Sequence, residues 1–588
     1  MSFLKRWLIE GTLTTYTPLR IGDGGTTKRL RLKNKQTGKP VQIASVATDM
    51  SERTHIPAST LKSRVKVWTK DCGMSPRIIE ILLGSDDPED KKPPNGQIIK
   101  AVAGKVEFDN APAIERKDFE HAPPHWCEER WTGVEAAVTI NRRTRAARDE
   151  RLFHQEYVPP GVTYKVVLRV RDAEKKDAGD KDDDEGITGE SGIVQLLAAM
   201  EGFNVRPHGV TLGSASGDGW GIFDWKLDSI KYIDCDGIKT WLEGAPTNWR
   251  EGLTELKKAE FDDIRVNAQR EAQTLARNLC TGSVPTLDVQ LACQDDFLVN
   301  DPTRTKALMD KAEDAPNHAP LRDVDGNAIL PRRSARGAFR AQAEKILRTI
   351  GGEKAACQAD DPQSLCQRKA IKEIAQVAGL CLACQVFGAP GWRSPFRISA
   401  FVAAPPDNAK SFAQTRDFVA IDRFTQGVAA ALKEVSLEDE AETREESAGM
   451  KFNAGVVHRP VLTGSIGIDL AALERAKIGN WAIGLLALTF RDLIEGDIRI
   501  GFGRGKGFGE IAARVTAIAP LAFNDVPASF QSGLTAADIA SVNPSLTREA
   551  LRAAKVGEFL TSAVEDLHRV IEQMNGGVTN EATEESEA

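Results

Sequence analysis

The sequence predicts an α+β protein made of two tandem copies of one ferredoxin-like domain, each with its own β-hairpin. A helix start, a hairpin tip and a glycine loop predict the duplication, because they occur in the same order in both halves. The copies that begin at Ile56, Ile140 and Gly213 return at Leu330, Ile421 and Gly501. Mixed strands and helices with long connections favour this class over a doubly wound parallel sheet.

The first copy begins with alternating apolar and polar residues over 3–19, which predict a strand. The basic stretch 26–49 lacks periodicity and predicts a long loop. A helix follows, which Ser59 or Thr60 is expected to cap and which ends near Cys72. The rest of the copy is expected to form hairpin strands, a further strand and a helix over 134–140, 152–158, 163–170 and 192–200.

The second copy repeats this order after a helical connection, 245–278. A long loop is expected over 295–325, and a hairpin with a long acidic tip between 418 and 457. The other predicted elements are strands 285–291 and 462–470, helices 334–350 and 481–494, and an amphipathic helix 547–574.

The repeat predicts four regions along the chain. A first domain, 1–240, is joined by a helical linker, 241–280, to a second domain, 281–540, which contains a cysteine-bearing insertion. The last region, 541–588, is expected to be a helix with a disordered acidic tail.

Composition narrows the class of protein. The chain has nine cysteines, no secretory signal and no run of about 18 apolar residues, so we expect a cytoplasmic protein without a membrane partner. A net charge of −7 argues against a polyanionic partner at first sight. The acidic residues, however, are concentrated in segments typical of solvated chain, namely 172–190, 434–446 and 581–587.

Basic residues gather at the duplicated motifs instead. Arg142, Arg143 and Arg145 lie in the first hairpin tip, and Lys62 and Arg64 follow the first helix start. The amino end of a helix with basic residues beside it suits phosphate groups, as on a nucleic-acid backbone. A solvated charged face is the alternative interpretation for each run taken singly.

These motifs resemble the RAMP superfamily, the RNA-recognition-motif-like proteins that build CRISPR effector complexes. The match is closest to the guide-RNA-coating backbone subunit of type III systems. The helix starts Ile56-Pro-Ala-Ser-Thr-Leu-Lys and Leu330-Pro-Arg-Arg-Ser-Ala-Arg-Gly, the hairpin motif Ile421-Asp-Arg-Phe-Thr and the glycine loop 501–509 carry this resemblance. Two such units in one chain look like the double-repeat subunit of type III-D complexes.

The resemblance implies three kinds of partner: the CRISPR guide RNA, a complementary target RNA and other subunits of a type III complex. The sheet and helix start would hold guide phosphates, and the hairpin, or thumb, would wedge between bases. Phe153 and Phe424 would then support an unstacked base. The expected RNA-binding residues are Ser59, Thr60, Lys62, Arg64, Arg142, Arg143, Arg145, Phe153, Gly213, Gly217, Gly219, Arg332, Arg333, Ser334, Arg336, Arg423, Phe424, Gly503, Arg504, Gly505 and Lys506.

The related backbone subunits also cut target RNA, usually with a divalent metal such as Mg²⁺, through an aspartate in the loop before the capped helix. In the second copy Asn317 occupies that register, and Asp314 and Asp323 are the acids around it. In the first copy Ile43 occupies it, which leaves Asp49 and the more distant Asp23. Loop aspartates are commonly turn residues, so cleavage and a purely structural role both remain open.

Four cysteines give a separate metal signal. Cys357, Cys366, Cys381 and Cys384 are close in the sequence, and four thiolates can form a tetrahedral zinc shell. The spacing differs from a paired CxxC motif, and buried free thiols are the alternative. The resemblance adds that related type III-D and III-E subunits carry a similar cysteine pair before a Phe-Gly, here Phe387-Gly388.

A guide-processing ribonuclease would need a histidine or tyrosine general base near a glycine loop. The eight histidines are scattered, and neither loop has one nearby in the sequence. Three functions therefore stay open: a guide-coating scaffold that also cuts target RNA, a scaffold that only coats, and a metal-independent guide-processing enzyme.

Overall fold

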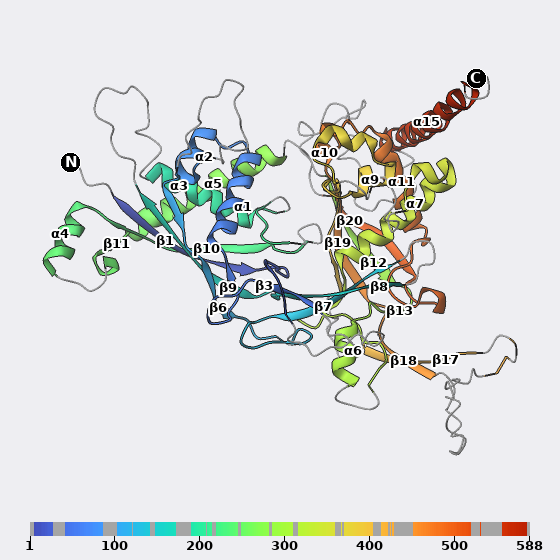
Figure 1. Cartoon of the computed structure of the whole chain (residues 1–588), viewed down its shortest axis with the longest axis horizontal. Helices are drawn as coiled ribbons and strands as arrows, with labels where there is room; N and C mark the ends of the chain where they lie inside the picture. The colour runs from blue at the N-terminus through green and yellow to red at the C-terminus, as the bar shows by residue number, and fades with distance from the viewer. Residues whose placement is uncertain are drawn as a thin grey trace, which may run out of the picture.

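A computed structural model gives the fold of the chain (Figure 1). It describes residues 5–27, 42–85, 103–119, 122–140, 147–171, 190–206, 209–214, 219–244, 249–280, 285–309, 315–358, 366, 370–403, 413–421, 424, 426–427, 451–518, 530 and 555–584.

The first unit is built on a seven-stranded antiparallel sheet in the order β11-β10-β1-β9-β6-β4, with β5 paired to β9. Alternate residues of β1 such as Ile9 and Leu13 are buried, because strand side chains alternate between faces. The strands are β1 (Arg6–Thr15), β4 (His55–Ile56), β5 (Val106–Phe108), β6 (Ala111–Arg116), β9 (Val162–Arg171), β10 (Phe223–Ile233) and β11 (Thr254–Glu255).

Helices complete the first core. α3 packs on α5 and touches α1 and α2, and all four contribute apolar side chains to one cluster with the sheet. The helix α5, expected to be a linker, thus belongs to the first unit through residues such as Ile264 and Leu275. The helices are α1 (Ala58–Asp71), α2 (Pro76–Leu83), α3 (Glu190–Glu201), α4 (Cys235–Gly244) and α5 (Lys258–Cys280).

The second unit has a six-stranded antiparallel sheet, β14-β16-β19-β12-β20, with β15 paired to β19. Its strands are β12 (Thr286–Cys293), β14 (Ala328–Leu330), β15 (Phe396–Ile398), β16 (Phe401–Ala403), β19 (Val461–Ile468) and β20 (Ile511–Ile518). Its helices are α6 (Pro302–Met309), α7 (Arg332–Ala355), α9 (Leu382–Phe387), α10 (Leu470–Arg475), α11 (Trp481–Ile494) and α15 (Lys555–Glu584).

The two sheets share one arrangement. The first strand of each unit, β1 or β12, lies between the last long strand, β10 or β20, and the strand that follows the hairpin, β9 or β19. In both units the pairing of first and last strands has an irregular register, at Glu10/Gly11 and at Asp288/Val289. The fold is therefore α+β with antiparallel main sheets, as the sequence predicts, and the repeat extends to details of strand pairing.

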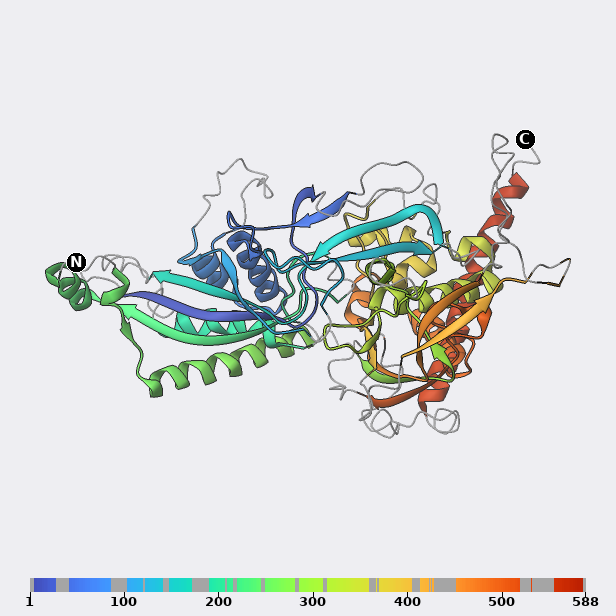
Figure 2. The same ribbon diagram turned by 90° about the horizontal axis from the view of Figure 1, so that it is seen from below.

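Each unit also carries a hairpin. In the first, the hairpin belongs to a small sheet, β2-β3-β8-β7, in which β3 pairs in parallel with β8. Figures 1 and 2 show the β7–β8 hairpin reaching over the second unit, whereas β17–β18 projects away from the first. The strands are β2 (Gly22–Thr27), β3 (Ile43–Val46), β7 (Gly133–Ile140), β8 (Ala147–Tyr157), β13 (Asp296–Phe297), β17 (Ala413–Val419) and β18 (Lys451–His458).

Three local predictions were wrong. The expected loop 26–49 contains part of β2 and all of β3, and the expected loop 295–325 contains β13 and α6. Neither Ser59 nor Thr60 caps α1: Pro57 is its N-cap residue, and the Asn110 side chain accepts a hydrogen bond from the Ala58 amide at 2.9 Å. These elements depend on partners that are distant in the sequence.

The helix boundaries also differ from those expected. α7 runs to Ala355, with a non-helical backbone at Gly352, where φ is 68°. The last helix, α15, packs on α11 and α7 and continues to Glu584, beyond its expected end at residue 574. Among the described residues, no helix is both long and apolar enough to cross a membrane.

Candidate nucleic-acid interface

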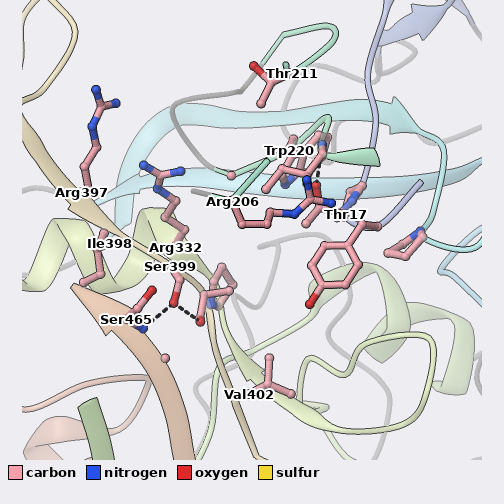
Figure 3. A pocket seen from close by; sticks show the side chains of 18 of the residues that line it. Thr17, Arg206, Thr211, Trp220, Arg332, Arg397, Ile398, Ser399, Val402 and Ser465 are labelled. Carbon is pink, nitrogen blue, oxygen red and sulfur yellow. Dashed lines mark hydrogen bonds between the residues drawn. The ribbon is translucent and has the colours of Figure 1, made fainter. Parts of the chain in front are cut away.

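A cleft of about 1570 Å³ lies between the two units, and both contribute to its walls. Arg64 on α1 and Arg206 come from the first unit, and Arg332 on α7 and Arg397 on β15 come from the second. Figure 3 shows Arg206, Arg332 and Arg397 among the side chains that line this pocket, together with Trp220. The tertiary structure thus gathers basic groups from distant parts of the chain in one cleft.

Several of these basic groups already have partners. Arg206 contacts Asp224 at 3.0 Å, and Arg397 contacts Asp469 at 2.8 Å. Arg64 donates to the carbonyl and hydroxyl oxygens of Thr211, at 2.9 and 3.3 Å, so its charge is not neutralised by this contact. Such contacts hold guanidinium groups in place at the cleft wall.

Three other cleft arginines, Arg304, Arg393 and Arg475, make no side-chain hydrogen bond or ion pair with any residue that the structure describes. Desolvation in the cleft and the positive charges of Arg397 and Arg64 lower the pKa of Arg393 to about 10, although the carboxylates of Asp469 and Asp71 act in the opposite direction. An anion beside Arg393 would relieve this repulsion and form charge-assisted hydrogen bonds. The cleft is therefore suited to phosphate groups.

Two ion pairs join the units across the cleft. Arg333 on α7 pairs with Glu135 on β7, and Lys117 pairs with Asp325 at 2.8 Å. The Lys117 pair is exposed and contributes little to stability by itself. Arg333, an expected RNA contact, is thus engaged by the first hairpin in this structure.

The first glycine loop lies against the start of α7. Gly219 has a positive φ of 83°, and a Cβ atom there would lie 3.3 Å from Cδ of Arg332. At Gly213 the same loop lies close to the chain after β1. A Cβ atom at this position would lie only 2.4 Å from the Arg20 carbonyl oxygen, so a larger residue would not fit. Gly501 takes the equivalent place in the second unit, at 2.6 Å from the Leu298 carbonyl oxygen.

The helix-start residues do not all reach this cleft. Ser59 and Lys62 line a separate small pocket beside Glu107, and Thr60 is in the first turn of α1. Desolvation and the nearby charge of Lys66 lower the pKa of Lys62. In the second unit, Ser334 is exposed and Arg336 is half-buried on α7.

The second glycine loop packs on the base of the β17–β18 hairpin. The Lys506 ammonium lies 4.7, 3.7 and 5.7 Å from the ring centres of Phe418, Phe452 and Phe502. Desolvation there lowers the pKa of Lys506. Lys506 therefore makes cation–π contacts within the protein, which hold the loop against the hairpin.

Among the other expected contact residues, Gly505, Phe153 and Phe424 are exposed, whereas Gly503 and Arg504 are half-buried. Gly503 has a φ of 78°, Arg504 Nε donates to the Gly501 carbonyl oxygen at 3.3 Å, and a Cβ atom at Gly505 would meet nothing within 4 Å. Phe153 is 50% exposed and Phe424 is 97% exposed. Six expected site residues lie outside the described residues: Arg142, Arg143, Arg145, Gly217, Asp314 and Arg423.

The described loop carboxylates both organise turns. Asp49 accepts hydrogen bonds from the Ser51 and Arg53 amides at 2.8 and 3.0 Å. Asp323 lines the cleft and accepts from the Asp325 and Asn327 amides at 3.0 and 2.8 Å. A turn role accounts for these contacts, and a role in RNA cleavage stays a prediction for both residues.

Asn317, at the register expected for a catalytic acid, forms a reciprocal pair with Asn453 on β18. Each backbone amide donates to the other residue's side-chain oxygen at 2.8 Å. An amide side chain can make this pair without carrying charge. The contact fastens the loop of the second unit to its hairpin.

The four predicted metal-binding cysteines come together beside α7. Their Sγ atoms all lie within 4.8 Å of one another, and those of Cys357 and Cys384 are 3.5 Å apart. Four thiolates around a tetrahedral zinc ion would be roughly 3.8 Å apart, given a Zn–S distance of about 2.3 Å. The donor set and the spacing therefore fit a zinc ion, as the sequence predicts.

Cys381 is the cysteine of the cluster whose sulfur ionises most readily, because burial and hydrogen bonds between the sulfurs raise the pKa of Cys357, Cys366 and Cys384. Hydrogen bonds from the Cys357 and Cys384 thiols lower the pKa of Cys381. Arg340 on α7 donates to the Cys384 sulfur at 3.1 Å, and the Cys381 amide donates to the Cys366 sulfur at 3.3 Å. N–H donors of this kind are common around thiolate ligands of metals and orient them.

Two histidines that are distant from the second glycine loop in the sequence lie near it in the structure. The His318 ring lies 4.6 Å from the Phe502 ring in the second glycine loop, and desolvation lowers its pKa. His458 Nδ1 lies 2.9 Å from an oxygen of buried Asp296, whose carbonyl accepts from the Gly509 amide at 3.3 Å. Both histidines are distant from that loop in the sequence, so local spacing gave no signal.

Sequence reasoning also missed several cleft residues, namely Arg206, Arg304, Arg393, Arg397 and Arg475. None belongs to a duplicated motif, and none lies in a basic run. The arginine pair at 393 and 397, just after Phe387-Gly388, was the one local signal available.

Comparison with known proteins also divides the chain into two regions. No curated protein sequence matches the chain. The family model of the RAMP superfamily matches two regions, residues 12–224 and 279–512, which correspond to the two units and cover most of the chain. The chain therefore belongs to the RAMP superfamily, with one matched region in each of its two units.

Proposed function

We propose that the chain is a guide-RNA-binding backbone subunit of a type III CRISPR RNA-targeting complex, of the type III-D kind, acting in the cytoplasm in antiviral defence. The cleft between the units carries this proposal. It combines the start of α7 with three cationic side chains, Arg304, Arg393 and Arg475, that form no side-chain hydrogen bond or ion pair with the described residues. Single-stranded RNA presents phosphates at regular intervals, and a cleft that spans both repeats can hold several.

The finer architecture supports the same proposal. We take the units to be ferredoxin-like domains with thumbs, because both place the first strand between the last and the third strands of the βαββαβ order. The β7–β8 hairpin reaches the second unit, where Glu135 pairs with Arg333. The β17–β18 hairpin, with exposed Ile421 and Phe424, would meet a neighbouring subunit of the complex in the same way.

Target RNA is the second nucleic-acid partner in this proposal. Bases of the bound guide would pair with it, and Asp314, Asp323 or Asp49 would help to hold Mg²⁺ for cleavage. A carboxylate can hold a hydrated divalent ion beside a phosphate and so stabilise the developing charge. A scaffold that only coats the guide is the alternative, and the turn contacts of Asp323 and Asp49 agree with it.

Reversing two cleft charges tests RNA binding. The double variant Arg393→Glu/Arg475→Glu is expected to weaken binding of single-stranded RNA and to lower the slope of log affinity against log salt by about 1.4, at about 0.7 per lost phosphate contact. Fluorescence anisotropy at several salt concentrations measures both quantities.

The matched control is Arg270→Glu/Arg277→Glu on exposed positions of α5, which changes the net charge equally but outside the cleft. The control is expected to keep the salt slope of the original protein. Equal slopes for the two double variants would show that the cleft does not hold RNA phosphates.

A metal-independent ribonuclease is the second candidate function, favoured by the pair of His458 and Asp296. Asp296 is buried and is also held by Arg416 at 2.5 Å, an arrangement that orients the imidazole. His458 could take the proton of a ribose 2′-hydroxyl, whose oxygen attacks the adjacent phosphorus. The bond to the 5′-oxygen breaks, that oxygen takes up a proton, and a 2′,3′-cyclic phosphate remains.

This candidate predicts cutting of guide precursor in EDTA. His458→Ala is expected to lower that rate by about 100-fold, within the usual range for a general base. Exposed His568 on α15 provides the control substitution, His568→Ala, which is expected to have no effect. An assay of labelled precursor that shows no cutting in EDTA, or equal rates for both variants, excludes His458 as the base.

A further inference from the structure

The long helix α7 connects the cleft with the cysteine cluster. Arg332 and Arg333 at its start line the cleft. Arg340 is eight residues further along, a distance of about 12 Å at 1.5 Å per residue. Two residues after the helix ends at Ala355, the chain reaches Cys357, the first cysteine of the cluster. The chain is non-helical at Gly352, so the continuous helix that begins at Arg332 reaches the cluster through Arg340 rather than through Cys357.

Arg340 makes the principal contact between α7 and the cluster. Its guanidinium donates to the Cys384 sulfur at 3.1 Å, to the Gly388 carbonyl oxygen at 3.0 Å and to Glu344 at 2.9 Å. The side chain is only 11% exposed, and Glu344 is completely buried. A buried guanidinium with all these acceptors has one available position, so it fixes α9, which contains Cys384, against α7.

Arg348 lies two turns further along the same face but contacts no sulfur. It donates to the Cys357 backbone oxygen at 2.9 Å and to Glu344 at 3.3 Å. Arg340 and Arg348 thus share one carboxylate partner, and only Arg340 reaches a candidate metal ligand. Arg340 therefore tests a contact with a ligand sulfur, and Arg348 tests a contact with the surrounding backbone.

The positive charge of Arg340 would compensate the negative charge of a metal site made of four thiolates. Four thiolates around a divalent cation carry a net charge of −2, and a buried site of that charge requires compensation. A guanidinium N–H bonded to a thiolate supplies positive charge and a directed hydrogen bond, and such partners orient metal ligands.

We propose that Arg340 is a positioning residue for a metal ion held by the four cysteines, and that metal binding, through Arg340, holds α7 in the position that binds RNA in the cleft. The second half of this inference rests on the proposed RNA-binding function. The two binding events are then coupled, and coupling between binding sites is reciprocal: bound zinc raises RNA affinity by the factor by which bound RNA raises zinc affinity.

The first experiment compares Arg340→Gln with the control Arg348→Gln in the full-length protein. Zinc affinity is measured by competition with a colorimetric chelator, and circular dichroism confirms that each variant is folded. Arg340→Gln is expected to lower zinc affinity about 10- to 100-fold, as for other groups that support metal ligands, and Arg348→Gln several-fold less. Zinc affinities within twofold of the original protein for Arg340→Gln would overturn its role.

The second experiment uses the unaltered protein and so does not depend on the folding of a variant. Zinc affinity is measured with and without a saturating single-stranded RNA oligonucleotide, and RNA affinity with and without zinc. We expect changes of about 5-fold or more, equal in both directions. Zinc affinity that is unchanged by bound RNA would overturn the coupling. Failure to bind RNA in any state would reject the proposed function as well, while the chelator result for Arg340 would still stand on its own.

Discussion

Replacing Cys384 by serine is expected to remove zinc from the protein and to unfold the second unit at a lower temperature than the first. Cys384 and Cys366 are buried in the apolar core of the second unit, so the cluster connects that core with the loop before α9. Structural zinc contributes apparent binding energies of about 10–16 kcal/mol in small peptides. Loss of about 5 kcal/mol would lower the melting temperature of this unit by roughly 10–20 °C.

Elemental analysis and differential scanning calorimetry measure the two effects. Cys293→Ser is the matched control, because Cys293 is buried in the same core but lies outside the cluster. Burial raises the pKa of Cys293 to about 12, as for a neutral apolar thiol. The control is expected to keep about one zinc ion per chain. A folded, metal-free original protein would show that the four cysteines are free thiols.

Replacing Asp314 or Asp323 by alanine is expected to remove one target-RNA cut, with a rate at least ~100-fold lower, comparable to the loss of other preorganised electrostatic groups. Guide binding should stay intact, and Asp49→Ala should have the smaller effect. The expectation rests on the proposed function, in which the carboxylate would help to hold a divalent ion beside the scissile phosphate. Cleavage of labelled target RNA by the assembled complex, with and without Mg²⁺, measures the rate.

The turn at Asp323 calls for a second variant. Asp323→Asn keeps a side-chain oxygen for the Asp325 and Asn327 amides but removes the negative charge. If the negative charge is needed to bind the metal ion, the Asp323→Asn variant should cut target RNA as slowly as the Asp323→Ala variant. If only the turn is needed, the asparagine variant should retain its cut. Cuts that persist after replacement of all three aspartates would assign cleavage to another subunit.

Elements with strong local patterns were predictable from the sequence. The helix 481–494 was predicted at the bounds of α11, and the paired strands β7–β8 and β17–β18 were found where two hairpins were expected. Side-chain periodicity within a dozen residues determines such elements. The strand β3 was missed because it has only four residues and lies between β2 and β8. Its partner β8 is about a hundred residues away, and no local pattern reports that pairing.

The candidate sites also differ in how far the sequence could predict them. The cysteine cluster was predictable because its four thiols are close in the sequence, and a metal site needs suitable ligands near one another. Arg304, Arg393 and Arg475 were missed because each belongs to a different segment of the second unit, and only the fold of that unit brings them to one wall of the cleft. The same applies to His458, which meets Asp296 across paired strands.

The sequence by itself determined the duplication, the α+β class, the two hairpins and the grouping of the four cysteines, since each depends on local pattern or on repetition. The tertiary structure alone decided that Asn110, rather than Ser59 or Thr60, satisfies the first amide of α1. It also decided that Arg333 meets Glu135 and that Arg340 reaches Cys384. These contacts join residues through space, because burial and charge pairing act over a few ångströms irrespective of separation along the chain.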